Sequence, residues 1–198
     1  MKYKFILVTT SPRRIELLRK LNIKFDVIPP KVVKEKYKGN NPCDIVICNA
    51  INKINSVDEE YKDKDTILIA ADTLIELNGK IIGKPQNRED AIRILKTLSG
   101  KWHNVYTGIA IKVGEKMYTD CCITKVKLKE LSMEEIEFYI ETREPLDAAG
   151  AYKIQGIGTI FIEEIHGSYD NVVGLPLNRL YMLLKKAGID LIKIISGQ

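Results

Sequence analysis

Hydrophobic residues recur along this chain with two periods, one typical of strands and one typical of helices. Continuous or alternating apolar runs predict strands. These runs lie at 4–9, 25–28, 66–71, 74–77, 80–83, 102–113, 116–128, 159–165 and 190–195. Apolar residues three and four positions apart predict helices, which lie at 12–21, 44–57, 88–98, 132–142 and 176–187. Strands and helices alternate early but hairpins are frequent, so the pattern predicts an α/β fold with a mixed sheet flanked by helices.

Turn and capping residues mark several element boundaries. Asn78 and Gly79 stand between two apolar runs, which is the strongest short signal for a hairpin. Ser132 with Glu135 three residues later predicts a capping box at the start of a helix. Residues 144–158 are rich in glycine and predict irregular structure. With no internal repeat and no linker, residues 1–198 are expected to form a single domain.

The first predicted strand runs directly into a helix whose start favours an anion. Ser11 suits the N-cap, Pro12 suits the first helical position, and Arg13 and Arg14 follow. Free backbone N–H groups and two arginines form a site suited to phosphate. The alternative, equally weighted on this segment alone, is a capped surface helix with solvated arginines.

Other polar residues occupy positions where chemistry is plausible. Asp72 directly follows the buried run at 66–71, and α/β sheets place ligand sites beyond the carboxyl ends of strands. The alternative is an aspartate that caps a turn. Lys53 lies on a predicted helix and Lys84 between Gly83 and Pro85, although an average lysine is a solvated surface residue. Gln155 offers a donor and an acceptor, as reading a base edge requires.

Composition limits the classes of protein. The net charge of +5 is mild, and no aromatic–basic motif supports nucleic-acid binding. No apolar run approaches the ~20 residues that span a bilayer, so we expect a cytoplasmic protein without membrane contact. The cysteine spacings match no zinc motif, and free thiols are expected in a reducing compartment. The cysteines are Cys43, Cys48, Cys121 and Cys122.

Taken together and in order, the motifs resemble the Maf family over nearly the whole chain. They are Thr10-Ser11-Pro12-Arg13-Arg14, Ala71-Asp72-Thr73, Gly83-Lys84-Pro85, Leu98-Ser99-Gly100, Thr107-Gly108, 144–156 and Gly174-Leu175-Pro176-Leu177. The resemblance implies a nucleoside triphosphate pyrophosphatase, which forms a monophosphate and pyrophosphate. It also implies a single Maf-like domain with an elongated mixed sheet, two lobes around a deep cleft similar to inosine triphosphate pyrophosphatase, and a homodimer.

The resemblance also implies roles for individual residues. Asp72 matches the proton acceptor, and with Glu35 it is a candidate ligand for Mg²⁺ or Mn²⁺, which prefer oxygen ligands. Positions that set nucleotide preference match Arg13, Thr73 and Gln155. Phosphate-binding positions match Ser11, Arg14, Lys53 and Lys84. The segment Lys153-Ile154-Gln155-Gly156 resembles the branch that acts on dTTP and UTP rather than on 7-methyl-GTP.

Two positions depart from the family pattern. Ala148 stands where the family usually has lysine, which removes a cation. Glu35 is displaced by about one position from the usual acidic residue. Ala148 leaves open a different reading, a non-catalytic nucleotide-binding regulator of cell division or septum formation.

Overall fold

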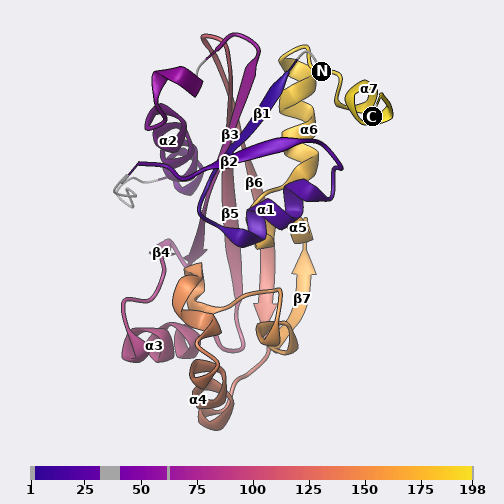
Figure 1. The fold of residues 1–198 in the computed structure, drawn as a ribbon. Coiled ribbons are helices and arrows are strands. Elements are labelled where there is room, and N and C mark those ends of the chain that lie inside the picture. Colours follow the sequence, from indigo (N-terminus) through magenta and orange to yellow (C-terminus); the bar gives the residue numbers. More distant parts are fainter. Residues whose placement is uncertain (1–2, 32–40, 62, 198) are drawn as a thin grey trace. The chain divides into compact units, whose positions relative to one another are not determined.

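The computed structural model describes residues 3–31, 41–61 and 63–197 (Figure 1). The chain divides into two compact units. Unit 1 comprises Met1–Asp72, Thr107–Cys122 and Gly174–Gln198, and unit 2 comprises Thr73–Tyr106 and Ile123–Val173. Three long strands continue from one unit into the other, so the chain passes between them repeatedly.

The described residues form a mixed sheet and a set of mostly short helices. The strands are β1 (Lys4–Val8), β2 (Phe25–Ile28), β3 (Thr66–Leu77), β4 (Lys80–Ile82), β5 (Trp102–Val113), β6 (Lys116–Leu128) and β7 (Ile162–His166). The α-helices are α1 (Pro12–Arg19), α2 (Pro42–Asn55), α3 (Arg88–Leu98), α4 (Met133–Glu141), α5 (Tyr169–Val173), α6 (Leu177–Lys186) and α7 (Leu191–Ser196). The 3-10 helices are η1 (Glu59–Tyr61), η2 (Glu144–Asp147), η3 (Ala149–Ala151) and η4 (Ile157–Phe161).

The sheet mixes parallel and antiparallel pairs, which confirms the predicted α/β class. Its order is β2-β1-β3-β5-β6-β7, with β4 paired to β3. Strand β1 runs parallel to β2 and β3, whereas β3–β4 and β6–β7 are antiparallel. None of the helices in the described ranges has the length and apolar content that crossing a bilayer requires.

The core of unit 1 forms where α2 covers one face of the parallel strands. Ile6 and Val8 of β1 and Leu68 and Ala70 of β3 project to this face, because side chains alternate along a strand. Ala50, Ile54 and Val57, on α2 and just after it, pack against them. The intervening strand residues are also buried, as expected for parallel strands covered on both faces.

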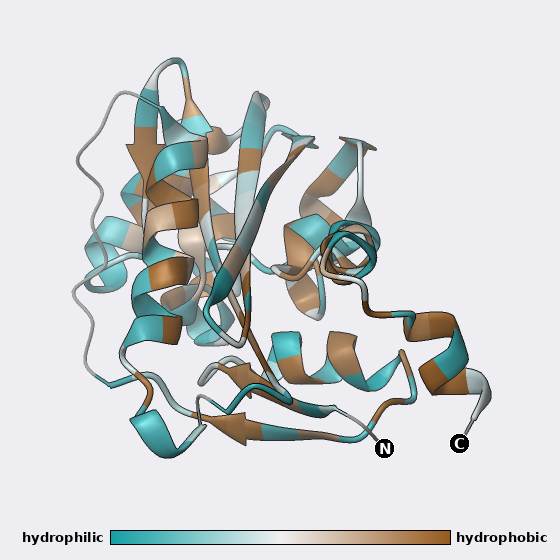
Figure 2. Ribbon diagram, turned by 90° about the horizontal axis from the view of Figure 1, so that it is seen from above, coloured by the Kyte–Doolittle hydropathy of each residue, from teal (hydrophilic) through white to brown (hydrophobic). Residues whose placement is uncertain are grey.

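The core of unit 2 packs α3 and α4 against β3, β5 and β6. Ile94, Leu95 and Leu98 of α3 and Ile136 and Tyr139 of α4 belong to one buried cluster. Figure 2 shows helices banded in hydrophobic and hydrophilic residues, as amphipathic helices that cover a core must be. The cap predicted at the start of α4 is confirmed, since its first residues form a complete capping box.

A buried polar pair lies in the same unit. The Nε2 atom of His103 lies 2.8 Å from the Oη atom of Tyr152. Burial lowers the pKa of His103 to about 4 and raises the pKa of Tyr152. His103 is therefore neutral at physiological pH.

Three predictions about secondary-structure elements are wrong. Residues 191–196 form helix α7 instead of a closing strand, because the side chain of Asp190 caps a helix by accepting from the N–H of Lys193. The predicted strand at 159–165 begins as η4 and becomes β7 only at Ile162. Strand β3 continues unbroken to Leu77, so Asp72 lies within a strand and not at its carboxyl end.

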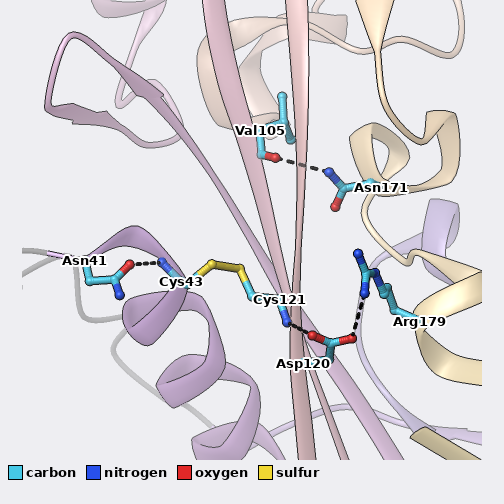
Figure 3. The surroundings of a disulfide bond; sticks show 7 residues. All are labelled: Asn41, Cys43, Val105, Asp120, Cys121, Asn171 and Arg179. Carbon is cyan, nitrogen blue, oxygen red and sulfur yellow. Dashed lines mark hydrogen bonds and ion pairs between the residues drawn. A yellow bond between two sulfur atoms is a disulfide. The ribbon is translucent and has the colours of Figure 1, made fainter. Parts of the chain in front are cut away.

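The expectation of four free thiols is also wrong. Cys43 in the first turn of α2 forms a disulfide with Cys121 on β6, with 5.7 Å between their Cα atoms (Figure 3). Sequence spacing could not reveal this pair, because 78 positions separate the two residues. Cys48 and Cys122 are outside this disulfide. Next to the disulfide, Asp120 forms an ion pair with Arg179 of α6 at 3.5 Å (Figure 3).

Candidate functional site

A buried carboxylate with two partners from one helix is the most unusual polar feature of unit 1. Lys53 donates from its Nζ atom to Oδ1 of Asp72 at 2.5 Å, and Asn49 donates from Nδ2 to Oδ2 at 2.8 Å. The Nζ atom of Lys53 also lies 3.3 Å from the carbonyl oxygen of Ala71. The exposed fractions of Asp72, Lys53 and Asn49 are 2%, 7% and 0%. We call these three residues the Asp72 cluster.

The sequence of α2 explains how the cluster forms. Asn49 and Lys53 are four residues apart, so both project from one face of the helix. The helix begins with Pro42 at its first position, and Asn41 caps it by accepting from the N–H of Cys43 at 3.0 Å. These local signals fix where α2 starts and therefore which residues face β3.

Close packing of α2 on β5 depends on Gly108. A Cβ atom built at Gly108 would lie 2.5 Å from the backbone C of Val46 and the backbone N of Ile47. Any side chain at this position would push the helix away from the strand. The absence of a side chain at Gly108 therefore allows the short side chain of Asn49 to reach Asp72.

The partners of Asp72 favour its ionised form. Burying a carboxylate is costly unless it is paired and hydrogen-bonded. Here the ammonium of Lys53 supplies the charge and the amide of Asn49 supplies a second hydrogen bond. The cluster therefore holds a negatively charged oxygen pair in a fixed orientation, as a proton acceptor or a metal ligand requires.

The start of α1 combines an open helix terminus with anchored residues. Ser11 occupies the N-cap position, but its side chain makes no capping hydrogen bond, whereas its N–H donates to Oγ1 of Thr9 at 3.0 Å. Pro12 fills the first helical position as predicted. Arg13 is half-buried, and Arg14 donates from Nε to the carbonyl oxygen of Gly174 at 2.8 Å. The Gly174 contact fixes the direction of one of the two arginines.

Lys84 lies in unit 2 on the rim of a cavity of about 360 Å³. The cavity is lined by β4 and α3, with Ile82 and Ile94 among its apolar residues. The Nζ atom of Lys84 lies 3.4 Å from Oδ1 of Asp147, and both side chains are more than half exposed. Because such surface pairs are weak, Lys84 is available to another anion at little cost.

Gln155 is half-buried in the loop between η3 and η4 of unit 2. Its Oε1 atom is buried and, within the part of the chain that the structure describes, has no hydrogen-bond partner. A buried acceptor without a partner is costly, and a ligand donor would remove that cost. Thr73, the other unit 2 residue expected to affect nucleotide preference, is half-buried on β3.

Residues 168–171 have a structural role in unit 2. Asn171 of α5 donates from Nδ2 to the carbonyl oxygen of Val105 at 3.1 Å, visible in Figure 3, and to Oγ1 of Thr124 at 2.9 Å. The same Thr124 hydroxyl accepts from the N–H of Ser168 at 3.0 Å. These bonds attach α5 to β5 and β6.

The predicted residues have different outcomes. The structure brings Asp72 and Lys53 together, and Lys53 contacts the carboxylate. Asn49 was missed, although its position one helical turn before Lys53 was a usable signal. Glu35 lies outside the described residues.

The donor set limits the kind of metal site that is possible. In residues 3–31, 41–61 and 63–197, no three His, Cys, Asp or Glu side chains are grouped to hold a metal ion. Mg²⁺ needs only one or two carboxylates when substrate phosphates supply further oxygens. Asp72 therefore fits a metal shared with a phosphate-bearing ligand.

Comparison with known proteins identifies the family. The model of the family described as Maf-like protein matches residues 4–187 and so includes segments of both units. A dTTP/UTP pyrophosphatase of Dictyoglomus turgidum is 47% identical over 195 residues, which is 97% of this chain and all of that protein. A dTTP/UTP pyrophosphatase of Aquifex aeolicus is 42% identical over 184 residues, covering 93% of this chain and 95% of the relative.

Solved structures show the same fold at low sequence identity. The Ham1 protein of Staphylococcus aureus aligns with a TM-score of 0.52 at 14% identity and covers 93% of this chain and 99% of its own. A HAM1 protein from Coxiella burnetii gives 0.50 with the same identity and coverage. With a family match over most of its length and relatives above 40% identity, the chain belongs to the Maf family.

Proposed function

We propose that this protein is a nucleoside triphosphate pyrophosphatase that acts on dTTP and UTP. Relatives covering nearly the whole chain at 42–47% identity carry that name. The structural observation that carries the proposal is the Asp72 cluster, a buried carboxylate that accepts hydrogen bonds from Lys53 and Asn49. The reaction splits the α–β anhydride bond with water and releases a monophosphate and pyrophosphate.

Asp72 is proposed as the proton acceptor. It orients a water molecule and takes its proton as the water oxygen bonds to phosphorus and pyrophosphate leaves. Lys53 and Asn49 fix both carboxylate oxygens, which favours a single orientation toward the water. The role of Lys53 is therefore to orient Asp72 and to add positive charge near the triphosphate.

The triphosphate needs several cationic partners. We assign this task to the start of α1, with Ser11, Arg13 and Arg14, and to Lys84 on the rim of the unit 2 cavity. Backbone N–H groups at a helix start and guanidinium groups both suit phosphate oxygens. Transition-state charge stabilisation of this type can lower a barrier by several kcal/mol. Thr73 and Gln155 are assigned to the base, with Arg13 also contributing to nucleotide preference.

A divalent cation is the proposed cofactor, either Mg²⁺ or Mn²⁺. Asp72 would hold it together with phosphate oxygens, and Glu35 is the second candidate ligand. When bound, the cation neutralises phosphate charge and polarises the bond to be broken. We also propose a cytoplasmic homodimer in which residues 1–198 form one Maf-like domain, on the basis of the family likeness. Light scattering on the purified chain would give its mass in solution.

The test is pyrophosphate release from a panel of nucleotides. Wild-type protein with Mg²⁺ or Mn²⁺ is expected to prefer dTTP and UTP over CTP, purine nucleotides and 7-methyl-GTP. The kcat of Asp72→Asn is expected to fall by at least about 100-fold, which is the lower end of the usual effect of removing a general base. Asp26→Asn is the matched control, because Asp26 is an exposed residue paired with Lys4 on the surface. Near-normal turnover by Asp72→Asn would disprove the assignment of the proton acceptor.

A further inference from the structure

The loop that carries Gln155 is held by a carboxylate that the proposed reaction does not use. Glu144 accepts through Oε1 from the hydroxyl of Tyr139 at 2.8 Å and from the N–H of Gly158 at 3.0 Å. Its Oε2 accepts from the N–H of Ile157 at 3.0 Å. Three donors thus converge on one side chain, and two of them belong to the first residues of η4, just after Gln155.

Tyr139 secures the other end of the same loop. Its hydroxyl accepts from the N–H of Lys153 at 3.0 Å while donating to Glu144. Its ring is fully buried and packs edge-on against Phe161, with ring centroids 5.1 Å apart. The loop at 153–158 is therefore attached on both sides of Gln155, at Lys153 and at Ile157 and Gly158.

The glycines of the loop match this attachment. Gly156 has a φ of +93°, a backbone conformation that residues with a side chain rarely adopt. A Cβ atom at this position would lie 2.5 Å from Oε2 of Glu144. A Cβ at Gly158 would collide with the carbonyl oxygen of Lys153 and the hydroxyl of Tyr139. The backbone therefore closes directly around the Glu144 carboxylate and the Tyr139 hydroxyl, with no space for a side chain between them.

The charge of Glu144 is maintained by the same contacts. Partial burial raises the pKa of this carboxyl, but hydrogen bonds from Gly158, Tyr139 and Ile157 and the charge of Lys153 lower it further than burial raises it. The net result is a pKa below the usual glutamate value. Glu144 is therefore ionised at neutral pH and can accept all three hydrogen bonds.

We propose that Glu144 and Tyr139 are positioning residues for nucleotide selection. They hold the loop so that Oε1 of Gln155 accepts from the imide N3–H of a thymine or uracil base. This inference rests on the proposed function, in which Gln155 contacts the base. Cytosine has an acceptor at N3, so while the loop keeps Oε1 of Gln155 facing the base, two acceptors stand against each other and the glutamine oxygen is left unsatisfied.

Two variants separate positioning from general stability. Tyr139→Phe keeps the buried ring and removes only the hydroxyl. Glu144→Gln keeps the shape but replaces one acceptor oxygen with a donor. Glu141→Gln is the matched control, since Glu141 lies at the end of α4 with its carboxylate 71% exposed and paired with Arg88. Gln155→Ala gives the effect of losing the side chain that is proposed to contact the base.

The main measurement is the ratio of kcat/KM for dTTP to that for dCTP. Tyr139→Phe and Glu144→Gln are expected to lower this ratio by roughly five-fold or more, the effect of one lost hydrogen bond. Gln155→Ala should do the same, and neither variant should lower the ratio further when added to Gln155→Ala. Glu141→Gln should leave the ratio unchanged.

Other results would overturn the inference. Equal losses for both nucleotides, or a lower melting temperature with an unchanged ratio, would show a structural role only. An unchanged ratio in Gln155→Ala would show that Gln155 does not select the base, and the inference depends on that role. Hydrogen exchange should accelerate at the amide of Lys153 in Tyr139→Phe and at the amides of Ile157 and Gly158 in Glu144→Gln, and unchanged exchange at these amides would also refute positioning.

Failure of the proposed function has a different signature. In that case wild-type protein releases no pyrophosphate from any nucleotide. The ratio of the Kd for dCTP to the Kd for dTTP, measured without divalent metal, then replaces the kinetic ratio. A Kd ratio that falls in both positioning variants would support the inference even without turnover, and an unchanged Kd ratio would reject it.

Discussion

The disulfide between Cys43 and Cys121 makes the stability of the protein dependent on redox conditions. It connects the first turn of α2 to β6 within unit 1, across 78 positions of sequence. The bond can be removed either by reduction with dithiothreitol or by the substitution Cys43→Ser. In both cases the folded contacts around the bond remain, and the main change is in the freedom of the unfolded chain.

The loop length sets the size of the effect. A cross-link that closes a loop of this length removes unfolded-state entropy worth about 4.5 kcal/mol at 25 °C. For a chain of nearly 200 residues this corresponds to a fall in melting temperature of roughly 9–18 °C on reduction. The effect is larger than that of most single substitutions, so it should be easy to measure.

The assay is thermal unfolding of oxidised and reduced protein, with thiols counted in denaturant. In denaturant, oxidised protein should show two titratable thiols, from Cys48 and Cys122, and reduced protein should show four. Cys43→Ser should melt like reduced wild-type protein and lose its response to reductant. Cys48→Ser should keep the full response, because Cys48 is exposed and outside the bond. Equal melting temperatures for protein with two and with four free thiols would refute the entropic reasoning.

Three further predictions concern stability. Because His103 is buried and neutral with a pKa of about 4, the unfolded state binds an additional proton between roughly pH 4 and 6.5. Its contribution to unfolding free energy should fall by about 3 kcal/mol as pH drops through that range, and urea unfolding of wild type and His103→Gln should show the difference. Gly108→Ala should lower the free energy of unfolding by about 1–3 kcal/mol or more, because the added methyl group overpacks α2 against β5. It should also reduce turnover by displacing Asn49. An unchanged free energy of unfolding in urea would contradict the packing argument. Ser132→Ala should cost about 1 kcal/mol through loss of the α4 cap, and unaltered stability would show that the cap contributes nothing.

Features encoded by neighbouring residues were predictable from the sequence. Strands β5 and β6 have the predicted bounds, since long alternating runs have few competing interpretations. The turn at Asn78 and Gly79 was predictable because both residues take positive φ, which asparagine and glycine tolerate. Short apolar runs were less reliable. Leu191–Ser196 reads equally well as strand or helix, and the cap at Asp190 decides for helix.

Features that depend on distant residues were not predictable. The disulfide requires α2 and β6 to be adjacent, and cysteine spacing does not contain that information. The importance of Asp72 was predictable from its position after an apolar run, but its partners Lys53 and Asn49 follow from how α2 packs on the sheet. The contact between Glu144 and the 153–158 loop was hidden in the same way, although three glycines between 150 and 158 indicated close backbone packing.

The division of unit 1 among three chain segments affects the order in which the protein can fold during synthesis. The hydrogen bond from Arg14 to Gly174 joins residues 160 positions apart, and α6 supplies Leu180, Leu183 and Leu184 as buried residues. All segments of unit 2 precede residue 174 in the sequence, whereas α6 and α7 of unit 1 are translated afterwards. The N-terminal strands of unit 1 must therefore wait, with apolar surface exposed, until α6 has left the ribosome. A ribosome stalled before α6 has left the exit tunnel should consequently hold a nascent chain that is recognised by chaperones.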